Sequence, residues 1–108
     1  MADYGVISFK GGGNTRYAFT SYSWDSRLAP KAGAYIITRR FKSDTMAIRH
    51  EVISIGTSRD FSKLIEAARA NKCYAKNYAN CVCLHSDSDT KSAEAKVKDL
   101  LKAYKPPC

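Results

Sequence analysis

The sequence predicts a small α/β (α+β) domain, in which a mixed sheet of about three to five strands is flanked by helices. Short runs rich in aromatic and β-branched residues predict the strands, and two stretches with apolar residues at helical spacing predict the helices. A chain of 108 residues has room for one modest core. We therefore expect one domain over residues 1–108, with an N-terminal hairpin extension at 1–30 and a core at 33–108.

The N-terminal hairpin is predicted from two strand-like strings, GVISF and TRYAFTSY. Gly11 to Asn14 separate them and supply the positive φ angles that a tight turn needs. A loop over 24–31 follows. The strings AYIIT and MAIRHEVISI, rich in Ile, Val and Tyr, are the expected central strands. Three cations fall in the expected connection between them: Arg39, Arg40 and Lys42.

A first helix is expected after Gly56, with Thr57 or Ser58 as its N-terminal cap. Apolar residues then recur at helical spacing, so one face of this helix should be buried. The residues of that face are Phe61, Leu64, Ile65 and Ala68.

The last third of the chain is predicted to form a loop over 71–80, a short strand at CVCLH and a closing helix. Asp87 or Asp89 is the expected cap of this helix, and Pro106 and Pro107 should end it. Its apolar stripe comprises Ala93, Val97, Leu100, Leu101 and Tyr104.

The charge balance favours a polyanionic partner. The chain has 18 Lys and Arg against 10 Asp and Glu, a net charge of +8. Such a balance favours binding to the phosphate backbone of DNA or RNA, although a basic surface also serves solubility. Tyr74 or Tyr78 could stack on bases. The candidate phosphate contacts are Arg39, Arg40, Lys42, Arg49, Lys63, Arg69, Lys72 and Lys76.

The sequence also sets expectations about location and cysteine chemistry. No apolar stretch approaches the length of a membrane span and no secretion signal is evident, so we expect a cytoplasmic protein with reduced cysteines. Cys81, Cys83 and His85 alternate and should share one face of a strand. Zinc with Cys73 as a fourth ligand is an alternative. The C-x-C-x-H spacing matches no usual zinc pattern, however, so we expect packing and no metal.

Four strings in order resemble the GIY-YIG nuclease superfamily. GAYIITRR resembles the first motif strand, and VISIGTSRDFSKLI resembles the second strand running into its helix. ANCVCLH and DLLKAYKPPC resemble the later strand and the closing helix with its tail. The resemblance implies that fold over residues 33–108. It also implies a phosphodiester-cleaving ancestry that uses two tyrosines, a helix arginine and a metal-binding glutamate.

The catalytic positions of the family are only partly matched. Tyr35 occupies the first tyrosine position, but Ser54 stands at the second. Leu64 stands at the arginine position and Val97 at the glutamate position. Since both charges are replaced by apolar residues, the resemblance implies a filled cleft without a metal. We therefore expect a nucleic-acid-binding domain that lacks catalysis and a cofactor.

Two alternatives remain open at this point. A divergent active endonuclease could use Tyr35 and Glu94 with Mg²⁺ or Mn²⁺, since Glu94 lies one turn before Val97. Lys63 or Arg59 would then replace the arginine, and a histidine, His50, could act as base if it faced the same side as Tyr35. The other alternative is a protein-interaction or inhibitor module built on the same scaffold, with a protein partner.

Overall fold

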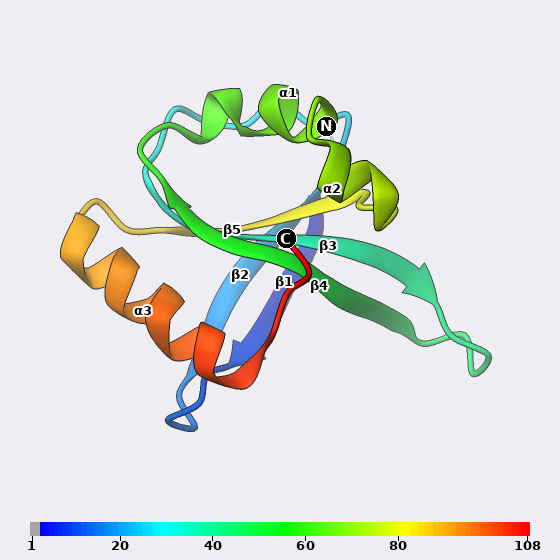
Figure 1. Ribbon diagram of the computed structural model, residues 1–108, viewed down its shortest axis with the longest axis horizontal. Coiled ribbons are helices and arrows are strands. Elements are labelled where there is room, and N and C mark those ends of the chain that lie inside the picture. The colour runs from blue at the N-terminus through cyan, green and yellow to red at the C-terminus, as the bar shows by residue number, and fades with distance from the viewer. Residues whose placement is uncertain (1–2) are drawn as a thin grey trace.

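The computed structural model describes residues 3–108 as a five-stranded sheet that lies between two layers of helix (Figure 1). The longest helix, α3, lies on one side of the sheet, and the short helices lie on the other. The elements are β1 (Asp3–Lys10), β2 (Arg16–Ser23), β3 (Gly33–Lys42), β4 (Ile48–Ser58), the 3₁₀ turn η1 (Phe61–Lys63), α1 (Leu64–Arg69), α2 (Lys72–Lys76), β5 (Cys81–Ser86) and α3 (Thr90–Ala103).

The strand order is β1-β2-β5-β3-β4, and every neighbouring pair is antiparallel. The α+β class is confirmed, but the prediction of a mixed sheet is wrong. The last strand, β5, inserts between β2 and β3 and runs antiparallel to both. The strands β2 and β3 run in the same direction, and β5 separates them. The N-terminal hairpin, β1 and β2, belongs to the same sheet through this pairing.

Each face of the sheet carries its own apolar cluster, and β5 shows the alternation directly. Cys81 and Cys83 pack on the α3 side, whereas Val82 and Leu84 pack on the side of α1 and α2. The α3-side cluster also contains Phe9, Phe19, Ala34, Ile36 and Leu100. The cluster under α1 and α2 also contains Leu28, Ile37, Ile53, Phe61 and Ile65.

A β-bulge interrupts the alternation of β4. Ile37 pairs with Ser54 and Thr38 pairs with Val52, so Ile53 is the extra residue. Ile53 packs into the cluster under α1 and α2, and the adjacent Ser54 contacts Tyr74 of that same layer. The bulge therefore turns two consecutive side chains toward one face, which strict alternation would not allow.

Several predicted boundaries need correction. Arg39, Arg40 and Lys42 belong to β3, since the strand runs to residue 42 and the turn covers only 43–47. The strand β4 continues through Ser58, so Asp60 rather than Thr57 or Ser58 caps the next turn by accepting from the Ser62 N–H. The expected loop over 71–80 contains α2.

The closing helix follows its prediction more closely. Asp89 caps α3 by accepting from the backbone N–H groups of Lys91 and Ser92. Ala93 and Leu100 are buried as expected, but Leu101 is 44% exposed. Leu101 is thus the residue that the predicted apolar stripe of α3 assigned wrongly.

The C-terminal tail joins the two helical layers. A disulfide links Cys108 to Cys73 of α2, with the two Cα atoms 6.0 Å apart. The Cys108 N–H also donates to the carbonyl of Ile53, the bulged residue of β4, at 3.1 Å. The prediction of reduced cysteines is therefore wrong for this pair, because folding brings residues 35 positions apart together. It holds for Cys81 and Cys83, which are free.

Across the described residues, none of the helices has both the length and the apolar character needed to cross a membrane.

Candidate nucleic-acid interface

Three hydroxyl-bearing side chains meet under α2, at the position of the predicted family motifs. The Tyr74 hydroxyl of α2 donates to Ser54 Oγ of β4 at 3.1 Å. Tyr35 of β3 packs in the same layer. Burial, and next the neighbouring Tyr74, raise the pKa of the Tyr35 phenol to about 12. Tyr35 is therefore protonated at neutral pH and is a poor general base there.

Tyr74 was expected to stack on bases, but the structure gives it a different role. Its side chain packs into the cluster under α1 and α2 and bonds to Ser54. Ser54 itself is 5% exposed. Tyr74 of α2 thus places an aromatic ring beside Ser54, which stands where the resembled motif has a tyrosine. Local spacing does not predict this contact, because it forms only when α2 packs over β4.

The two replaced family positions lie on opposite faces of the sheet. Leu64 packs in the cluster that also includes Tyr35, whereas Val97 of α3 packs against the other cluster. The expectation that both residues fill one cleft is therefore wrong. The reason is that α1 and α3 cover different faces of the sheet (Figure 1).

Glu94 lies at a separate hollow of about 350 Å³ near the start of α3. Arg59 and Asp87 line the same hollow, but Tyr35 does not. His50 is also placed away from Tyr35. It bonds to Thr38 at 2.8 Å and lies on the α3 side of the sheet, so the condition that it share a side with Tyr35 is not met. The structure does not gather the expected catalytic set.

Part of the predicted basic set gathers on the projecting β3–β4 hairpin. Beyond Ile37, the alternation of β3 turns Arg39 and Phe41 toward the side that carries α2, and Arg49 pairs opposite Phe41. The Arg39 guanidinium lies 4.2 Å from the centre of the Phe41 ring and 3.3 Å from the Glu51 carboxylate. Arg49 is exposed, as is Lys42 near the turn.

The helix α2 continues this basic surface beside the base of the hairpin. Lys72 and Lys76 are exposed, and Tyr78 is 78% exposed with a positive φ of 59°. Asn80 fixes this segment to β3 by bonding both the N–H and the carbonyl of Arg40, at 2.7 and 3.0 Å. We define the basic hairpin surface as Arg39, Phe41, Arg49, Lys72, Lys76 and Tyr78.

The remaining predicted cations lie elsewhere. The Arg40 guanidinium stacks on the ring of Tyr4 at 3.8 Å, on the face opposite Arg39. Arg69 donates to the Trp24 carbonyl and pairs with Asp25 at 3.4 Å. Lys63 is exposed in η1. The eight predicted residues therefore do not form one patch.

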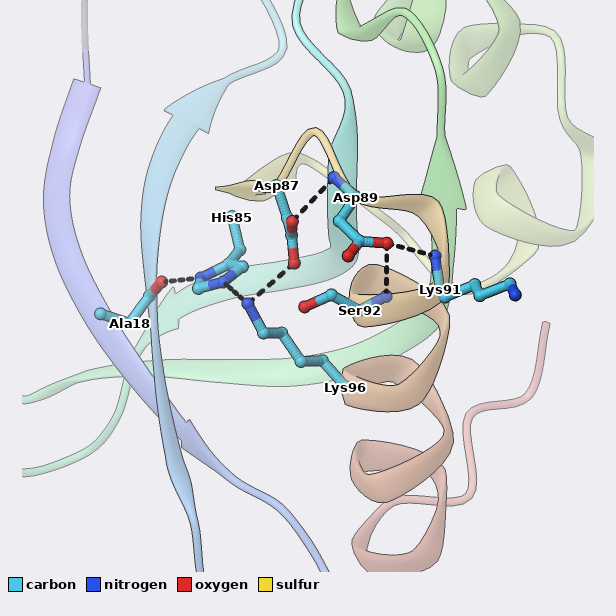
Figure 2. Close-up of polar contacts among 7 residues, drawn as sticks. All are labelled: Ala18, His85, Asp87, Asp89, Lys91, Ser92 and Lys96. Atoms are coloured by element: carbon cyan, nitrogen blue, oxygen red, sulfur yellow. Dashed lines mark hydrogen bonds and ion pairs between the residues drawn. The ribbon is translucent and has the colours of Figure 1, made fainter.

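A polar cluster that local spacing does not predict joins β5 to the start of α3 (Figure 2). Lys96 Nζ lies 2.9 Å from both His85 Nε2 and Asp87 Oδ2. Because His85 Nδ1 lies 2.8 Å from the Ala18 carbonyl, which can only accept, Nδ1 carries the proton and Nε2 accepts from Lys96.

The charge of this group is stabilised from several directions. A hydrogen bond from Ser92 and then one from Lys96 lower the pKa of Asp87 to about 2, and the Asp89 N–H also donates to it. Asp87 is thus an ionised acceptor. The cluster fastens α3 to the sheet, and its lysine is already committed to neighbours within the chain.

Comparisons with protein-family models, with curated proteins and with solved structures find no match to this chain.

The four residues that the sequence offered as zinc ligands do not come together in the structure. Cys73 is held in the disulfide, and His85 is bonded to Lys96 and Ala18. Cys81 and Cys83 instead lie beside His50 of β4. His50 was missed because its proximity to β5 depends on how three strands pair, which local spacing does not show.

Proposed function

We propose that this protein binds the phosphate backbone of DNA or RNA through the basic hairpin surface and does not cleave it. The observation that carries the proposal is the pairing of Arg39 with the Phe41 ring on the side of the sheet that carries α2, together with the exposed Lys72 and Lys76 of that helix and Tyr78, which is 78% exposed. Cations neutralise phosphates with release of counterions, and aromatic rings stack on unpaired bases. The net charge of +8 adds long-range attraction.

The two aromatic residues favour a single-stranded ligand within this proposal. Phe41 lies on the hairpin beneath Arg39, and the exposed Tyr78 lies in the segment after α2. Bases in a duplex are already stacked, whereas those of a single strand are available to rings of this kind. We expect weak sequence preference, because phosphate contacts and stacking do not read base edges.

The surroundings of Tyr35 do not favour cleavage. Its phenol is held protonated beside Tyr74, and the carboxylate of Glu94 lines a hollow that Tyr35 does not reach. Antiparallel pairing of β3 and β4 places Tyr35 opposite Gly56, so the two motif-like strands lie side by side. This arrangement supports the resemblance to the GIY-YIG superfamily as a scaffold, which remains part of the proposal.

Fluorescence polarisation with labelled single- and double-stranded oligonucleotides tests the proposal. The variant Lys72→Gln/Lys76→Gln removes two charges from the surface, and Lys91→Gln/Lys98→Gln removes two exposed charges from α3 as a matched control. The first variant should lower the slope of log affinity against log salt by about 1.4–1.8, because each of the two phosphate contacts contributes about 0.7–0.9. The control should keep the wild-type slope.

Three outcomes would contradict the proposal. Affinity that does not change between low and moderate salt would exclude phosphate binding. Equal losses in both double variants would show that net charge alone acts. Failure to bind any oligonucleotide, together with a protein partner that stays bound after nuclease treatment, would favour the protein-interaction module instead.

A further inference from the structure

Two thiols and an imidazole meet on the α3 side of the sheet, outside the basic hairpin surface. Cys81 and Cys83 come from β5 and His50 comes from β4, and one ligand atom from each lies within 4.8 Å of the others. Both cysteines are free and fully buried. The period of the strand explains the thiol pair, because residues two apart on β5 point to the same face.

Neighbouring hydroxyls hold the three groups in place. Thr38 pairs with Cys81 across the sheet, and its Oγ1 lies 2.8 Å from His50 Nδ1. Ser21 Oγ lies 3.5 Å from Cys83 Sγ. Metal-binding histidines usually have one ring nitrogen oriented by a polar neighbour of this kind, and such partners affect metal affinity strongly.

Both thiols would lose their protons when a metal binds. Cysteine binds metals as the thiolate, so Cys81 and Cys83 would each release one proton to solvent on binding.

An approach from solvent lies next to the cluster. A hollow of about 240 Å³ is lined by His50 and by Ser21. His50 is one of the three proposed ligands, and Ser21 contacts Cys83, another of them. Tyr4 and Arg40 form part of its wall. An ion could therefore reach His50 without unfolding the sheet, and a water could occupy the open side.

We propose that His50, Cys81 and Cys83 form a Zn²⁺ site, with a water from the adjacent hollow as the fourth ligand. Zn²⁺ is bound tetrahedrally by thiolate and imidazole ligands, and sites with three protein ligands keep an open position. Two thiolates balance the two positive charges of the ion, so the bound cluster is neutral, as a buried site requires. The proposal departs from the sequence-based expectation of no metal.

Titration of the full chain with Co²⁺, a spectroscopic substitute for Zn²⁺, tests the site. The protein is kept under anaerobic conditions without a thiol reductant, so that the Cys73–Cys108 disulfide stays closed. We expect a thiolate-to-cobalt charge-transfer band that saturates at roughly one equivalent and disappears when Zn²⁺ is added. Absence of this band would overturn the proposal.

Two histidine variants provide a matched comparison. His50→Gln should weaken Co²⁺ binding at least about tenfold, whereas His85→Gln, which removes an imidazole outside the cluster, should not. Equal weakening by both variants would overturn the site. Cys83→Ser should remove most of the charge-transfer intensity.

A stability measurement covers the case in which the buried cysteine variant does not fold. His50 is only partly buried, so His50→Gln is the safer variant. Zn²⁺ in excess should raise the Tm of the wild type, because an ion that binds only the folded state stabilises it. It should raise the Tm of His50→Gln much less. An equal rise in both proteins would contradict the site.

Discussion

Tyr35 lies across Gly56, its partner on the neighbouring strand. A β-carbon at position 56 would come within 2.6 Å of the phenolic oxygen of Tyr35 and 2.8 Å of its Cζ. The glycine therefore makes room for the ring, which packs toward Tyr74 in the layer beneath α1 and α2. The motif-like strings that contain Tyr35 and Gly56 therefore depend on each other, because the Tyr35 ring fits only when residue 56 has no side chain.

This contact predicts the effect of filling position 56. Gly56→Ala should destabilise the protein by about 1–3 kcal/mol, because the added methyl group overlaps a ring that is packed on its other side. Urea unfolding measures the loss. In a Tyr35→Ala background the same change should cost much less, and an equal cost in both backgrounds would show that the ring is not the obstacle.

Plasmid nicking assays should detect no cleavage in the presence of Mg²⁺ or Mn²⁺. Tyr35 is protonated at neutral pH, and Glu94 lies at a different hollow. Tyr35→Phe should keep the oligonucleotide affinity of the wild type, since the hydroxyl has no role in the proposed binding. Metal-dependent nicking that disappears in both Tyr35→Phe and Glu94→Gln would establish the divergent endonuclease instead.

The Asp87 carboxylate should make stability sensitive to acid. Its pKa in the folded protein is about 2, below its ordinary value of 3.8, so its ionised form stabilises the fold. The advantage of the wild type over Asp87→Asn should be complete above the ordinary pKa and should disappear as the pH falls to about 2. Tm values across that range measure it.

The matched control for this experiment is Asp44→Asn, in the exposed turn between β3 and β4. A difference between wild type and Asp87→Asn that stays constant at every pH would show that the bonds to Ser92 and Lys96 do not depend on the charge of Asp87.

Removing the disulfide should lower stability substantially. Cys73→Ser/Cys108→Ser opens a link between residues 35 positions apart, and a closed loop of this length contributes about 3–4 kcal/mol through the entropy of the unfolded chain. The urea midpoint should fall, and the reduced wild type should unfold at the same midpoint as the variant. A reduced wild type that unfolds with the oxidised midpoint would contradict this account.

The sequence was sufficient to predict the elements that depend on local pattern. The turn after β1 and the buried faces of α1 and α3 follow from residues close together in the chain. Phe61 and Leu100, for example, are fully buried or nearly so, as their helical spacing predicts. The alternation of Cys81 and Cys83 toward one face is likewise confirmed.

The strand order, the bulge and the grouping of side chains at the candidate sites depend on contacts between distant segments. Insertion of β5 between β2 and β3 brings His50 to the two thiols and leaves Val97 on the face opposite Leu64. The bulge at Ile53 turns Ser54 toward Tyr74, although strict alternation would give these neighbours opposite faces. Local spacing contains no information about these pairings, so the candidate site could be predicted only in part.

The C-terminal tail has a consequence for association between molecules. The strand β4 is an outer strand of the sheet, and such strands expose backbone groups that can recruit a strand from another chain. The Cys108 N–H donates to one of these groups, the carbonyl of Ile53, and the disulfide to Cys73 holds Cys108 in that position. We expect reduction to release this contact, so that the oxidation state of one cysteine pair decides whether the Ile53 carbonyl is open to a strand from another molecule.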